Sequence, residues 1–175
     1  MPWSGSSVWT TGNSVDLVAS GTYNLTCFGG TGNCVDLSGD RPGSLSTSIF
    51  LAPGSYQLAF LATGNQLDSF GGTYPQSSIN YSIGLLSGST GLLTNNSTAF
   101  QSYGGLFTIT TGGSYLLTFS QAPGGDPYRG SIIDNVSISA VPEPATWGMM
   151  LLGFGLMGFG LRRRRREFKN VELAR

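Results

Sequence analysis

Residues 55–61 read Ser-Tyr-Gln-Leu-Ala-Phe-Leu, which places Tyr56, Leu58 and Phe60 at alternate positions. Alternation with period two puts every second side chain on the same face of a β-strand. One apolar face with a polar reverse is typical of antiparallel strands that cover a core on one side only. The segment therefore predicts a strand of an antiparallel sheet.

The same alternation recurs in three further segments. Its apolar positions are Ile79, Tyr81, Ile83 and Leu85, then Phe107 and Ile109, and then Tyr115, Leu117 and Phe119. Pairs of turn-forming residues separate the segments, namely Pro53-Gly54, Gly71-Gly72, Gly104-Gly105, Gly112-Gly113, Gly124-Gly125 and Asp126-Pro127. Strands at roughly ten-residue spacing predict an all-β fold, an antiparallel β-sandwich or jelly roll, over residues 1–140.

The end of the chain joins three different elements. Residues 141–144 read Val-Pro-Glu-Pro and should be extended, because proline lacks an amide hydrogen and disfavours helix at the residue before it. Residues 145–161 are uncharged and predict one transmembrane helix of roughly 25 Å, at the short end for a bilayer. A basic tail, residues 162–175, follows and should stay cytoplasmic. Its topology signal is Arg162, Arg163, Arg164, Arg165 and Arg166.

This order of motif, apolar segment and arginines resembles the PEP-CTERM sorting signal of Gram-negative bacteria over Val141 to Arg166. The resemblance implies that exosortase, a membrane-embedded cysteine transpeptidase-like enzyme, recognises the sorting motif Val141, Pro142, Glu143 and Pro144. It also implies an exported protein, first an inner-membrane-anchored precursor and then part of the cell surface or extracellular matrix. The alternative is a permanently anchored single-pass membrane protein, since nine residues, Glu167 to Arg175, follow the arginines.

The first residues, Met1-Pro-Trp-Ser-Gly5, contain neither the basic nor the apolar segment of a secretory signal peptide. A sorting signal has no use on a chain that does not reach the export machinery. We therefore expect an N-terminally truncated sequence, rather than insertion through the C-terminal helix alone.

A second resemblance covers about residues 8–140. It is carried by Cys34–Gly39, Gly43–Thr47, Leu51–Phe60, Ala62–Gln66 and the closing strand Arg129–Ser139, which look like ectodomains common among PEP-CTERM proteins. Those ectodomains resemble galactose-binding-like jelly rolls. The resemblance implies a surface that contacts sugars or polymers, with a structural or adhesive role linked to exopolysaccharide.

Charge is divided along the chain although the total is zero. Residues 1–140 hold two arginines against six aspartates, a net −4, whereas residues 162–175 hold seven cations against two glutamates, a net +5. An outer part without a basic patch argues against nucleic acid as a partner. The basic tail is better explained by topology and by contact with anionic lipid.

Cys27 and Cys34 are separated by a glycine-rich hexapeptide that lets them meet. In an exported protein we expect them to form a disulfide, which should contribute about 2–3 kcal/mol. Metal binding by two cysteines is disfavoured because the chain contains no histidine.

Asp36, Asp40, Asp126 and Asp134 are candidate ligands of a structural calcium ion, since loop carboxylates suit that ion. The alternative is that they cap turns. Asp134 is two residues from both Ile132 and Val136, so in a strand its carboxylate should face the core as they do. A buried carboxylate needs a partner, and Arg129 or a cation would serve. No other cofactor is expected.

We expect no enzymatic activity. Without histidine, Ser-His-Asp and Cys-His nucleophiles are excluded, and the six aspartates of residues 1–140 show no pairing of the kind that glycoside hydrolysis uses. Tyr128 lies in a loop, Gly124-Gly-Asp-Pro-Tyr-Arg-Gly130, and is the candidate sugar contact because tyrosine offers a flat apolar face with a polar edge.

Overall fold

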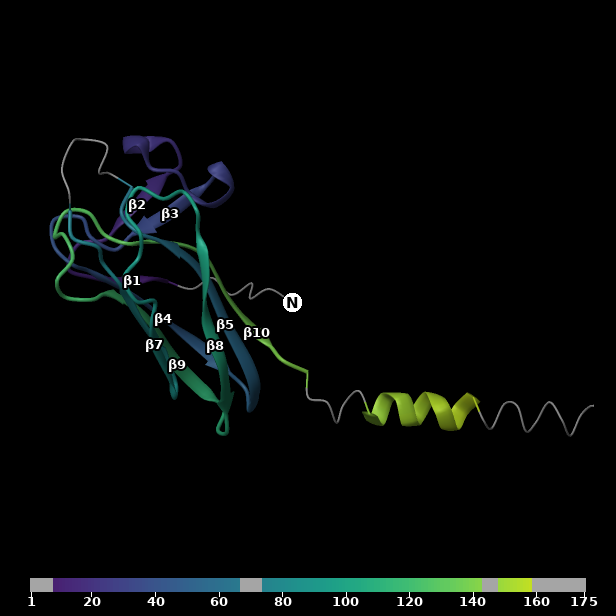
Figure 1. Cartoon of the computed structure of the whole chain (residues 1–175). Coiled ribbons are helices and arrows are strands. Elements are labelled where there is room, and N and C mark those ends of the chain that lie inside the picture. Colours follow the sequence, from purple (N-terminus) through teal and green to yellow (C-terminus); the bar gives the residue numbers. More distant parts are fainter. Residues whose placement is uncertain (1–7, 67–73, 143–147, 159–175) are drawn as a thin grey trace, which may run out of the picture. The chain divides into compact units, whose positions relative to one another are not determined.

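The computed structural model describes residues 8–66, 74–142 and 148–158. The chain divides into two compact units, residues Met1–Ala140 and residues Val141–Arg175 (Figure 1). The first unit holds all strands of the described chain, and the second holds one helix at residues 148–158.

The first unit is a β-sandwich of two five-stranded sheets whose neighbouring strands are all antiparallel. One sheet has the order β1 (Thr10–Gly12), β4 (Ser44–Leu51), β9 (Gly113–Gln121), β6 (Ile79–Ile83) and β7 (Leu86–Ser89). The other has the order β2 (Asp16–Ala19), β3 (Asn33–Asp36), β10 (Ile132–Ala140), β5 (Gly54–Thr63) and β8 (Gln101–Ile109). Two short 3-10 turns, η1 (Thr22–Asn24) and η2 (Phe28–Gly30), lie between β2 and β3. The predicted antiparallel sandwich is confirmed.

The main core fills the space between the sheets and is built on Phe60. Its ring lies 4.9 Å from that of Phe119 and 5.1 Å from that of Tyr81, centroid to centroid. Both partners belong to the opposite sheet, so aromatic contacts hold the two layers together. The predicted alternation is therefore correct for β5, β6, β8 and β9.

Two details of the prediction are wrong. Leu85 is 95% exposed, because Gly84 adopts a positive φ of 58° and turns the chain from β6 into β7. Gly104-Gly105 is not a turn but lies inside β8. A side chain at Gly104 would collide with the backbone carbonyl of Leu58 on β5, so the glycine permits close approach of two strands.

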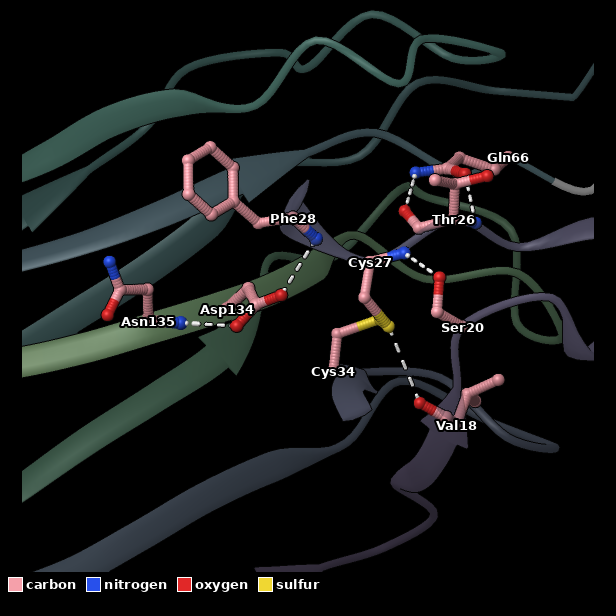
Figure 2. Close-up of a disulfide and its surroundings, with 9 residues drawn as sticks. All are labelled: Val18, Ser20, Thr26, Cys27, Phe28, Cys34, Gln66, Asp134 and Asn135. Carbon is pink, nitrogen blue, oxygen red and sulfur yellow. Dashed lines mark hydrogen bonds between the residues drawn. A yellow bond between two sulfur atoms is a disulfide. The ribbon is translucent and has the colours of Figure 1, made fainter. Parts of the chain in front are cut away.

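A smaller hydrophobic cluster contains Val18, Leu25 and Ile132 around the Cys27–Cys34 disulfide. Figure 2 shows this disulfide between the η2 turn and β3. Both cysteines are almost fully buried, and the amide of Cys27 donates to Ser20 Oγ at 3.2 Å. The predicted disulfide is confirmed.

The helix of the second unit presents large apolar side chains to its surroundings. Met149, Met150, Leu151, Leu152, Phe154, Leu156 and Met157 are all exposed. Within the described ranges the helix spans about 16 Å. Among all the described residues of the chain, no helix is long and apolar enough to cross a membrane.

Candidate functional site

The loop between β9 and β10, residues 122–131, is anchored by a buried polar network. Gln121, the last residue of β9, donates from Nε2 to Ser38 Oγ and to the Asp126 carbonyl, each at 3.2 Å. Its Oε1 accepts from the Ser131 amide at 3.0 Å, and the Ser131 and Ser77 hydroxyls lie 2.6 Å apart. These groups are buried and mutually satisfied, which makes the base of the loop rigid.

Asp36, at the end of β3, ties the same loop to the second sheet. Its Oδ1 accepts from the amides of Ser38 and Gly130, each at 2.9 Å. A side chain at residue 130 would collide with this carboxylate, so glycine is required there. Burial raises the pKa of Asp36 to about 7, the two amides oppose that shift, and the charges of Asp16 and Asp126 add to it.

A folded-state pKa of about 7, above the ordinary 3.8, means that the fold favours the protonated form of Asp36. Stability from this group is complete below about pH 4 and is lost as pH rises toward 7. We expect Asp36→Asn, which keeps an acceptor for both amides, to remove this loss. Urea unfolding of both proteins from pH 4 to pH 8 should show the variant gaining stability over wild type as pH rises. Parallel curves would mean that Asp36 ionises in the fold as readily as in the unfolded chain.

Tyr128 belongs to the loop that this network anchors, and 62% of the residue is exposed. Its amide donates to Asp126 Oδ1 at 2.8 Å. Arg129 carries the next side chain, with its guanidinium carbon 3.7 Å from the centre of the Tyr74 ring and its Nη1 4.0 Å from Asp126 Oδ1. The loop thus presents one outward ring beside a cation that is already held by an aromatic face and a carboxylate.

The four predicted calcium ligands lie in three separate places. Asp36 and Asp126 share the loop network, whereas Asp40 is exposed and lies 3.7 Å from Arg41 Nε. Asp134 lies beside the disulfide. A calcium ion takes six to eight oxygens, so these carboxylates do not form the common site that the sequence suggested.

The predicted pairing of Asp134 with Arg129 is wrong, whereas a cation as its partner stays a prediction. Its oxygens accept from the amides of Phe28 at 2.9 Å and Asn135 at 2.6 Å (Figure 2), while Arg129 pairs with Asp126 instead. The reason is an irregularity of register between Asp134 and Ser137, where Asn135 adopts a positive φ of 49°. This β-bulge breaks the alternation on which the parity argument depended. Cys27, Cys34 and Asp134 lie within 4.8 Å of one another, but the sulfurs are bonded to each other and cannot bind metal.

The outer surface of the first sheet carries an ordered array of polar side chains that no local sequence pattern indicates. The strand register aligns hydroxyl and amide side chains into two rows across the sheet, which we call the hydroxyl face. The rows are Thr10, Ser46, Thr118, Ser82 and Ser87, and Ser44, Ser120, Asn80 and Ser89. Strands lie about 4.8 Å apart and same-face residues about 6.8 Å apart, so these groups form a regular grid. A shallow hollow of about 400 Å³ lies over its β6, β7 and β9 part.

The sorting segment begins where the sandwich ends. β10 finishes at Ala140, Val141 is half-buried and Pro142 is exposed. Glu143, Pro144 and the arginines of the topology signal lie outside the described residues.

Comparison with known proteins gives the fold of the first unit and a short sorting motif at its end. The fold of the first unit is similar to TmCBM61 in complex with β-1,4-galactotriose, at 16% identity and a TM-score of 0.54 over 76% of this chain and 88% of that one. It is similar to a family 35 carbohydrate-binding module from Clostridium thermocellum, at 12% identity and a TM-score of 0.51 over 76% and 92%. A cyclase from Fischerella sp. TAU, in complex with 4-(1H-indol-3-yl)butan-2-one, is similar at 18% identity and a TM-score of 0.53 over 77% and 85%. At these identities the likeness establishes the fold alone.

The first unit therefore has the jelly-roll fold found in carbohydrate-binding modules. Residues 140–165 match the PEP-CTERM protein-sorting motif, so the chain carries this motif from the final residue of its last described strand onward. The motif indicates an exported protein that is sorted to the cell envelope. No curated protein matches the chain.

Proposed function

We propose that this chain is a surface or extracellular-matrix protein that exosortase recognises at Val141–Pro144 and cleaves near that motif. The observation that carries the proposal is the position of the PEP-CTERM match, which begins at the final residue of β10. A folded domain that ends at the motif can be released intact, because cleavage there removes no strand. The exposure of Pro142 agrees with access by an enzyme.

In this proposal residues 145–161 span the inner membrane in the precursor, and the arginines hold the tail in the cytoplasm. The apolar side chains exposed on the helix at 148–158 support burial in lipid rather than in water. The second candidate is permanent single-pass anchoring, which is favoured by the nine residues that follow the arginines.

Intact-mass measurement of the surface-exposed protein distinguishes the two candidates. We expect a mass that ends near residue 144. A mass that includes residues 145–175 would instead establish a permanent anchor.

For the jelly roll we propose binding to an exopolysaccharide, in a structural or adhesive and non-enzymatic role. Support comes from the fold and from two surfaces with suitable chemistry. Tyr128 offers a ring for stacking on a pyranose, and the hydroxyl face can exchange hydrogen bonds to water for hydrogen bonds to sugar. Residues 1–140 contain no lysine and carry a net charge of −4, so we expect uncharged contacts rather than attraction to an acidic polymer.

A titration of the full chain with purified matrix polysaccharide tests this proposal. We expect binding that is weak per site, detectable at millimolar sugar and equal at low and high salt, because uncharged contacts are not screened. Tyr128→Ala should weaken binding at least about fivefold if the ring stacks on sugar. Thr118→Val, which removes a hydroxyl and keeps the shape, reports on the hydroxyl face in the same assay. Absence of binding at millimolar sugar would leave a purely structural sandwich.

A further inference from the structure

A groove opens between the two sheets at the β1–β4 and β2–β3–β10 side of the sandwich. Its volume is about 460 Å³, within the usual range of small-molecule sites. Both layers contribute to the walls, with Trp9 and Leu45 from one side and Val35 and Ile133 from the other. Leu17 on β2 completes the wall although 72% of it is exposed.

The rim of the groove is polar but uncharged apart from one carboxylate. The β-bulge of β10 brings Asn135 to the rim, and Asn33 lies there at the start of β3. Neither side-chain amide is hydrogen-bonded to a described residue, and Figure 2 shows the Asn135 amide directed away from the Asp134 carboxylate. Asp134 is the single ionisable residue among the described residues of the lining, and its two oxygens already accept from the amides of Phe28 and Asn135.

These features restrict the chemistry of an occupant. Aliphatic walls and the half-buried Trp9 favour an apolar body, since removing such surface from water stabilises the complex. Two available amides at the rim favour a hydroxyl or carbonyl end group. None of the described residues that line the groove is a cation, and Asp134 repels negative charge, so anionic ligands are disfavoured. A polysaccharide would find few hydrogen-bond partners on these walls, in contrast to the hydroxyl face.

We propose that this groove is a binding site for an uncharged amphiphile, a molecule with an alkyl or aromatic body and one hydroxyl or carbonyl end. The body lies between Trp9 and Leu17, and the polar end lies at Asn33 and Asn135. This site is separate from the Tyr128 loop and from the hydroxyl face, and its occupant is not the polysaccharide.

The test uses the full chain in lipid nanodiscs and an octanol that carries a photoactivatable diazirine. After irradiation, chymotryptic peptides are analysed by mass spectrometry, which locates the label even if the probe also enters lipid. We expect labels in the peptides that contain Leu17 and Val136. Competition by 1-alkanols, expressed as their free aqueous concentration, should strengthen about fourfold for each added methylene until the chain fills the groove. Decanoate should compete at least about tenfold less well than 1-decanol, because it is charged.

Matched variants locate the effect. Leu17→Asn should lower groove labelling at least about fivefold, whereas Leu116→Asn, a similarly exposed leucine on the outer face of β9, should leave it unchanged. If Leu17→Asn fails to fold, the competition series on the wild-type protein still tests the proposal. Labelling confined to residues 148–158, equal loss in both variants, equal competition by decanoate, or protection by matrix polysaccharide would each overturn the proposal.

Discussion

Replacing Pro142 and Glu143 together with alanine should leave the full-length 18.4 kDa chain in the membrane when it is expressed behind a signal peptide in an exosortase-containing host. Wild type in the same host should be trimmed near residue 144. The physical reason is that proline at 142 lacks an amide hydrogen and has a fixed φ, so it opposes extension of β10 beyond Ala140. Alanine at both positions removes the recognition groups and lets the strand or the helix extend. Immunoblotting of membrane and released fractions measures the result.

The control for this experiment is Ser137→Ala combined with Ser139→Ala, two exposed positions on β10 just before the motif. That variant should be trimmed like wild type. If the Pro142 and Glu143 variant is also trimmed and released, the motif is not the processing site and the permanent anchor becomes the better account.

The sequence predicted the sandwich because burial imposes a simple rule on each strand. Where one face covers the core, alternation survives in the sequence, as at Leu58 and Phe60. The rule failed at Leu85, where a positive φ at Gly84 reverses the chain and ends the alternation. It failed again at Gly104, because a glycine that permits close strand contact looks the same in sequence as a glycine in a turn.

The site was less predictable because its contacts join distant residues. Gln121 and Ser38 are far apart in the chain, and nothing near either one signals a partner. The hydroxyl face likewise exists through register, which aligns serines and threonines from five strands and leaves no local pattern. The exposure of Tyr128 was predictable, since an aromatic residue within a glycine-rich loop lacks a core-facing position, while its contact with sugar stays a prediction. The direction of the Asp134 side chain was not predictable, because a β-bulge changes it and no residue type in the sequence marks that bulge.

The second large effect concerns the stability on which any surface role depends. Phe60→Ala should lower the free energy of unfolding of residues 1–140 by about 3–5 kcal/mol, because the ring is 1% exposed and its loss leaves a cavity between the sheets. Phe60 contacts Tyr81 and Phe119 of the opposite sheet, so the loss falls on the contact between layers. Domains of this size are stable by only about 5–15 kcal/mol, and the variant should therefore unfold at much lower urea.

Phe50→Ala is the matched control, since that ring is 73% exposed on β4 and its removal should change stability by about 0.5 kcal/mol or less. Pulse proteolysis of the full chain across a urea series measures both. Equal midpoints for the two variants would mean that the sandwich is not held together through Phe60.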